Sequence, residues 1–85
     1  MGHHGAMRSR KVDSQRLRVL LDERGMSKRD LADMAGLSYS FIKYLVPRTG
    51  PAQRNCGATA TLIAMALGVD PDDFSTPQRY ADVAA

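Results

Sequence analysis

The sequence predicts an all-α fold, a compact bundle of about five short helices in one domain. Three observations predict it. Apolar residues recur three and four positions apart through most of the chain, which is the spacing of a helix face. Serine or aspartate precedes several of these segments and glycine follows them, as helix caps do. No segment shows the sustained alternation of apolar and polar residues that is typical of a strand.

The first helix is predicted over residues 14–24. Its apolar face consists of Val12, Leu17, Leu20 and Leu21. Either Asp13 or Ser14 is placed to cap its start, since both side chains accept hydrogen bonds from the first turn. Gly25 is expected to end it.

Two further helices follow closely. Ser27 caps the second helix, and Asp30 three residues later completes a capping box. This helix stops at Gly36, and its apolar residues are Leu31, Met34 and Ala35. Ser38 caps the third helix, which ends before Pro47 because proline disfavours helix at the preceding residue. The buried residues of the third helix are Phe41, Ile42 and Leu45.

The last third of the chain is predicted to be a loop followed by helices. Residues 48–55 contain glycine and proline and are interpreted as a loop. A fourth, largely apolar helix, closed by Gly68, is defined by Thr59, Leu62, Ile63, Ala66 and Leu67. Asp70 and the proline after it predict a short fifth helix that carries Phe74. Residues 76–85 are expected to form a tail or a short sixth helix.

These elements define the expected domain organisation. Residues 1–7 are interpreted as an expression-tag remnant and flexible start, and residues 8–75 as the domain. Cys56 is interpreted as a small filler or a loop thiol. The methionines expected in the core are Met26, Met34 and Met65.

Size and composition exclude several classes of function. The chain has 85 residues, of which 44% are hydrophobic, and a chain of this size buries only about 60–65% of its unfolded surface. That core is too small for an enzyme with a deep pocket between two lobes. The longest apolar stretch, 58–69, has 12 residues, whereas a membrane span needs roughly 20. One cysteine and the absence of a secretory signal favour a cytoplasmic protein, associated with the nucleoid in a bacterial host.

The charge is divided unevenly along the chain. The net charge is +3, but residues 8–54 carry eleven basic against five acidic side chains, and residues 55–85 carry one against four. A basic segment suits a phosphate-rich partner, because each neutralised phosphate releases condensed counterions. Charge alone leaves open whether these residues bind phosphate or only solvate helix faces.

Residues 27–45 carry the most specific pattern. Two helices joined by three or four residues cross at about 90–120°, which requires a small residue at the crossing and a turn residue that tolerates positive φ. Ala32 and Gly36 meet these requirements. Apolar anchors flank the turn at Leu31, Leu37, Ile42 and Leu45. The pattern predicts a helix-turn-helix; an ordinary αα-hairpin is the alternative.

With these residues, the sequence resembles the lambda-repressor/Cro family of helix-turn-helix proteins, the XRE family. The matching segments are 17–27, Leu31-Ala32, Gly36-Leu37-Ser38, Ser40, Ile42 and 63–69. The resemblance covers about residues 12–74 and implies a lambda-repressor-like bundle whose third helix lies in the DNA major groove. The chain departs from the family at Lys28, where glutamine is usual, and at Val46-Pro-Arg-Thr-Gly50, which replaces a Glu-x-Gly pattern.

A third helix in the major groove reads bases with its first turn and its solvent face. The residues expected to contact bases are Tyr39, Ser40, Lys43 and Tyr44. For both tyrosines, partial burial in the core is the alternative. The residues expected to contact the DNA backbone are Lys28, Arg29, Ser38, Arg48, Arg54 and Asn55. Arg8, Arg10 and Lys11 are expected either to form an arm along the DNA or to be inert.

These observations predict a sequence-specific double-stranded DNA-binding transcriptional regulator, a phage-type repressor or Cro-like protein. It is expected to bind a palindromic operator as a homodimer, with an interface in the acidic C-terminal third that includes Phe74, Tyr80 and Val83. Neither a catalytic set nor a cofactor, metal, membrane or small-molecule partner is predicted. The alternative function is a protein-interaction module, such as a toxin-binding antitoxin.

Overall fold

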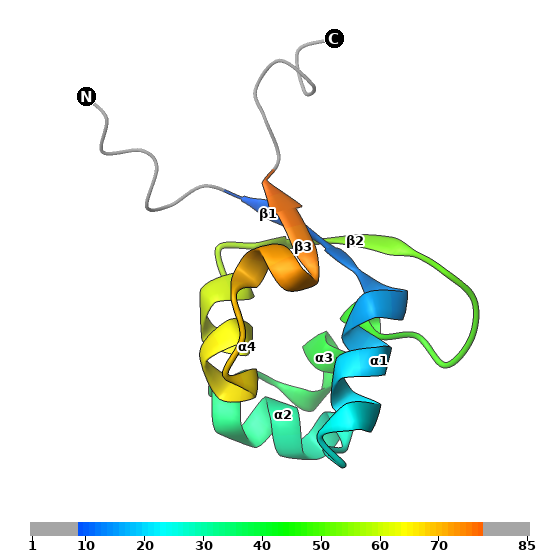
Figure 1. The fold of residues 1–85 in the computed structure, drawn as a ribbon, viewed down its shortest axis with the longest axis vertical. Helices are drawn as coiled ribbons and strands as arrows, with labels where there is room; N and C mark the ends of the chain where they lie inside the picture. Colours follow the sequence, from blue (N-terminus) through cyan, green and yellow to red (C-terminus); the bar gives the residue numbers. More distant parts are fainter. Residues whose placement is uncertain (1–8, 78–85) are drawn as a thin grey trace, which may run out of the picture.

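A computed structural model describes residues 9–77 of the chain. The four α-helices are α1 (Ser14–Glu23), α2 (Lys28–Ala35), α3 (Tyr39–Leu45) and α4 (Ala60–Leu67). The three strands are β1 (Arg10–Asp13), β2 (Gln53–Gly57) and β3 (Ser75–Pro77), and one 3-10 turn, η2, covers Pro71–Asp73. The strands lie at one end of the molecule and α2 lies at the opposite end (Figure 1).

The expectation of an all-α fold is wrong, because the three strands form an antiparallel sheet in the order β2-β1-β3. Val12 of the central strand lies opposite Arg54 of β2 and Ser75 of β3. Part of the segment predicted as a loop, 48–55, is therefore paired in β2. The strands are short and β1 buries only Val12, so the sequence contains no alternation long enough to indicate them.

The bundle of five helices is likewise corrected to four helices and one 3-10 turn. Asp70 caps this turn, as the sequence predicts: its carboxylate accepts a hydrogen bond from the N–H of Asp72 at 2.9 Å, and its own N–H donates to the Asp73 carboxylate at 3.3 Å. The turn ends after three residues, and Phe74 is buried beyond it with 1% of its surface exposed. Of the predicted tail or sixth helix, Thr76 and Pro77 lie in β3, while residues 78–85 lie outside the described residues, as do residues 1–8, which include the predicted tag remnant 1–7.

The predicted caps of the first three helices are confirmed. Asp13, rather than Ser14, is the N-cap of α1 and accepts hydrogen bonds from two backbone N–H groups. Ser27 forms the expected capping box with Asp30 at the start of α2. Ser38 caps α3 by accepting a 3.1 Å hydrogen bond from the N–H of Phe41. These side chains satisfy N–H groups that have no partner inside a helix.

Three elements far apart in sequence meet at Asp13 and Ser14. The N–H of Asp13 donates to the carbonyl of Phe74 at 2.8 Å, and the N–H of Ser14 donates to that of Ala52 at 2.9 Å. The Ser14 hydroxyl, fully buried, donates to the same Ala52 carbonyl at 2.9 Å. The start of α1 is thereby hydrogen-bonded to the residues that directly precede β2 and β3, the two strands beside β1.

The core takes apolar residues from every helix and from the sheet. The largest fully buried apolar side chains are Phe74, Leu17, Leu31, Ile42, Leu45, Ile63, Val12 and Val46. Cys56, in β2, is a core filler rather than a loop thiol, since it is 2% exposed and its Sγ donates to the carbonyl of Arg10 at 3.2 Å. Burial raises the pKa of this thiol above its ordinary value.

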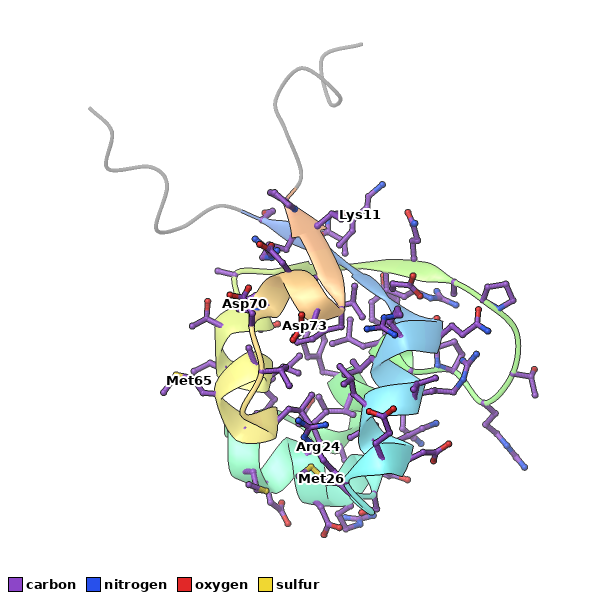
Figure 2. All side chains as sticks on the ribbon, in the orientation of Figure 1. Lys11, Arg24, Met26, Met65, Asp70 and Asp73 are labelled. Carbon is purple, nitrogen blue, oxygen red and sulfur yellow. The ribbon has the colours of Figure 1, made fainter. Side chains whose placement is uncertain are left out.

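The expected core methionines are partly wrong. Met26 is half-buried and packs on the core, but Met34 and Met65 are 61% and 73% exposed. Met65 extends outward from α4, whereas Met26 lies at the α2 end of the molecule (Figure 2). Because α4 is apolar on every side, its sequence does not fix which face is buried. The helix buries Ala60, Ile63, Ala64 and Leu67 and leaves Leu62 44% exposed.

Candidate nucleic-acid interface

The turn between α2 and α3 depends on Gly36. Its backbone has φ 71° and ψ 32°, the left-handed conformation that glycine adopts without a steric penalty. The N–H of Leu37 then donates to the carbonyl of Ala32 at 2.9 Å and closes the end of α2. Ala32 is 1% exposed. The two helices are thus fixed against each other by the residues that the sequence singles out.

One side of α3 faces the core and the other faces solvent. Ile42 and Leu45 are fully buried. The opposite side carries the four residues predicted to contact bases, which are Tyr39, Ser40, Lys43 and Tyr44. Ser40 and Lys43 are exposed and Tyr44 is 45% exposed. Tyr39 is half-buried and packs against the core, which the sequence left as the alternative for this side chain.

Both tyrosines of α3 lie beneath cations. The guanidinium carbon of Arg29 lies 4.3 Å from the centroid of the Tyr39 ring, and the Nζ of Lys43 lies 5.0 Å from it. The guanidinium carbon of Arg54 lies 5.0 Å from the Tyr44 ring. These distances are within the range of cation–π attraction. They link α2, α3 and β2 at a single surface.

The residues predicted to contact the DNA backbone come from these elements and the loop between them. Lys28 and Arg29 lie in the first turn of α2, and Arg48 is exposed in the loop after α3. Arg54 and Asn55 lie in β2, which lies beside α3. Ser38 is exposed, and its hydroxyl oxygen is engaged as the α3 cap. The sheet, which the sequence did not indicate, is therefore what carries Arg54 to the recognition helix.

Three other basic residues make hydrogen bonds that belong to the scaffold. Arg10 donates to the Ser75 hydroxyl at 2.8 Å and pairs with Asp72, so it is part of the sheet and not of a free arm. Arg24 donates to the carbonyl of Leu67 at 2.7 Å, at the end of α4. Arg16 donates to the carbonyl of Asp73 at 3.2 Å. Lys11 is an exposed residue of β1, and Arg8 lies outside the described residues.

Arg18 holds the loop that follows α3. Its two terminal nitrogens donate to the carbonyls of Pro47 and Gly50, each at 2.9 Å. The sequence does not reveal this role, because a carbonyl acceptor is available at every residue and residue type does not show which one an arginine reaches.

Among residues 9–77, the basic residues near α3 form no ion pair. Within residues 9–77 the one ion pair joins Arg10 to Asp72, so Lys28, Arg29, Lys43 and Arg54 have no carboxylate within 4 Å. We call these four residues the basic face. The acidic residues Asp70 and Asp73 lie near the sheet instead (Figure 2).

Residues 16–78 match the family of Cro/C1-type HTH DNA-binding domains. The chain belongs to this family. The resemblance to XRE proteins inferred from the sequence is confirmed, and the α2–α3 pair of this Cro/C1-type domain is a DNA-binding helix-turn-helix rather than an ordinary αα-hairpin. No curated protein matches the chain.

Two solved structures are similar in fold to this Cro/C1-type domain. They are native PhpD with cadmium atoms and PhpD with cadmium complexed with hydroethylphosphonate. Each is 26% identical with a TM-score of 0.62, over 80% of this chain and 14% of that chain. The domain therefore spans about one seventh of the PhpD chain. Among residues 9–77, no three His, Cys, Asp or Glu side chains are grouped to hold a metal ion, and no helix is long and apolar enough to cross a membrane.

Proposed function

We propose that this Cro/C1-type domain is a sequence-specific transcriptional regulator of double-stranded DNA, a phage-type repressor or Cro-like protein. The basic face carries the proposal. Its cations lie beside the solvent face of α3 and have no carboxylate partner among the described residues, so phosphate groups supply the missing countercharge. The solvent face of α3 itself, uncovered by the rest of the domain, enters the major groove.

The two sets of residues have different tasks. Ser40, Lys43 and Tyr44 face the bases, and Lys43 is long enough to donate to the O6 and N7 atoms of guanine. The residues assigned to the phosphate backbone are Lys28, Arg29, Ser38, Arg48, Arg54 and Asn55. Phosphate contacts fix the position of the protein on the duplex, and base contacts select the sequence.

The proposed DNA-bound form is a homodimer on a palindromic site, because one recognition helix reads only a few base pairs. Phe74 does not belong to the dimer interface predicted from the sequence, because it is a core residue with 1% of its surface exposed. Tyr80 and Val83, the other residues of that predicted interface, lie outside the described residues. The exposed apolar side chains of α4, Leu62 and Met65, support an interface on that helix instead.

Selection of bound sites from a random duplex pool tests the function. We expect enrichment of a palindrome whose half-sites are one helical turn apart. Lys43→Ala should relax the preference at one position of each half-site, at a cost of about 1–3 kcal/mol for the wild-type site. A pool that stays random after selection contradicts sequence-specific recognition, and an equal loss on all sequences assigns Lys43 to a phosphate.

The exposed apolar residues of α4 also favour a second candidate function, a protein-interaction module such as a toxin-binding antitoxin. A helix with no charged residue that leaves Met65 73% exposed offers apolar area to a protein partner. The same selection distinguishes the candidates, because a module that acts only through a protein does not enrich a DNA sequence.

A further inference from the structure

The ring of Tyr39 joins the two helices of the DNA-binding motif. Tyr39 opens α3, Arg29 lies in the first turn of α2, and both Arg29 and Lys43 lie over the Tyr39 ring at 4.3 and 5.0 Å. The ring is half-buried and packs against the core. A rigid ring thus holds two long, flexible cations that come from different helices.

Two like charges on one ring repel each other, and among the described residues no carboxylate lies within 4 Å of either cation. The ring offsets part of the cost through attraction between each cation and its π electrons. The arrangement also limits the rotamers of both side chains before any ligand binds. Less conformational entropy is then lost when each cation makes a contact.

The same contacts restrict what Tyr39 can do. Arg29 and Lys43 already lie over the ring, so the ring is engaged by side chains of the protein itself. This disfavours packing of the ring on a base or a thymine methyl group. Tyr39 is better suited to act through its neighbours than to touch DNA.

We infer that Tyr39 is a positioning residue that couples a phosphate contact by Arg29 to a base contact by Lys43. Arg29 binds a backbone phosphate and so fixes α2 on the duplex. The ring then sets the ammonium group of Lys43 at a defined distance from that phosphate. Sequence discrimination therefore depends on Tyr39 although Tyr39 makes no base contact. This inference rests on the proposed function of α3 as the recognition helix.

Discrimination between two duplexes tests the inference, namely the site enriched from the random pool and the same site altered at the position read by Lys43. Tyr39→Phe keeps the ring and should keep the wild-type ratio of affinities within about twofold. Tyr39→Leu removes the ring and should lower the ratio by about fivefold to tenfold. In the double variant with Lys43→Ala, Tyr39→Leu should add nothing further, since both changes remove one coupled contact.

A variant that keeps the size of the ring separates positioning from a structural role. Pentafluorophenylalanine at position 39 keeps the size of the ring, and so the packing, but withdraws the electron density that attracts cations. It should lower the ratio as Tyr39→Leu does, even where Tyr39→Leu fails to fold.

The results distinguish this inference from the function on which it rests. A wild-type protein that enriches no site contradicts the proposed function, and the inference with it. A wild-type protein that discriminates, together with an unchanged ratio in the fluorinated variant, overturns only the positioning role. A ratio of affinities that falls as much in Tyr39→Phe as in Tyr39→Leu also overturns the positioning role, because the hydroxyl group then contacts DNA directly.

Discussion

At the scale of single residues, Cys56 links burial to a pH dependence. Its thiol is buried in β2, and desolvation raises its pKa because the thiolate loses the stabilisation of water. In the unfolded chain the thiol ionises at its ordinary, lower pKa. The thiol therefore stabilises the fold fully below the unfolded pKa, and this contribution is lost as the pH rises through the folded pKa.

We therefore expect the free energy of unfolding to fall more steeply with pH above about 8.5, the ordinary pKa of a cysteine thiol, in the wild type than in Cys56→Ala. Urea unfolding at several pH values measures both curves, and the alanine variant corrects for every other group of the protein. Parallel curves contradict the raised pKa.

Gly36 is a second residue whose role can be tested alone. A Cβ added at this position meets no atom within 4 Å, so the cost of Gly36→Ala comes from the left-handed backbone, about 1–2 kcal/mol of unfolding free energy. Gly36→Asn should cost less, because asparagine tolerates this conformation. Equal losses of unfolding free energy in Gly36→Ala and Gly36→Asn, measured by urea unfolding, would contradict the assignment of this cost to the left-handed backbone.

At the scale of elements, local signals were predictable and distant pairings were not. The caps at Ser27, Ser38 and Asp70 each act within three residues, so the sequence indicates them directly. The sheet joins β1 to strands that begin about 40 and 65 residues later, and each strand is too short to show its own pattern. The fifth helix was predicted from correct caps, but the chain turns into the core at Phe74 after one 3-10 turn.

The loop after α3 gives a prediction at this scale. Arg18→Met removes the two hydrogen bonds to Pro47 and Gly50 and should lower the unfolding free energy by about 1–3 kcal/mol. It should also speed amide hydrogen exchange in residues 46–52. Arg16→Met, which removes one exposed 3.2 Å hydrogen bond to Asp73, is the matched control. Unchanged exchange in Arg18→Met shows that the loop is held by other contacts.

At the scale of the whole molecule, the uneven charge and the helix-turn-helix motif could both be predicted from the sequence. Which basic residues support the fold and which are left to bind a ligand could not. The sequence places the basic excess before residue 55 and the acidic excess after it. Which arginines serve the scaffold depends on tertiary contacts, such as Arg10 with Ser75 across the sheet. The buried face of α4 was predicted only in part for a related reason: Ile63 and Leu67 are buried but Leu62 is 44% exposed, because a helix without charged residues takes its orientation from its neighbours.

The central claim is that duplex DNA binds across α2, α3 and β2 at the basic face. Backbone amide chemical shifts, followed by NMR while a selected duplex is added, test it most directly. We predict the largest changes at the start of α2, through α3 and at Arg54, with small changes in η2 and β3. Changes centred on η2 and β3, or on α4 alone, would contradict this account.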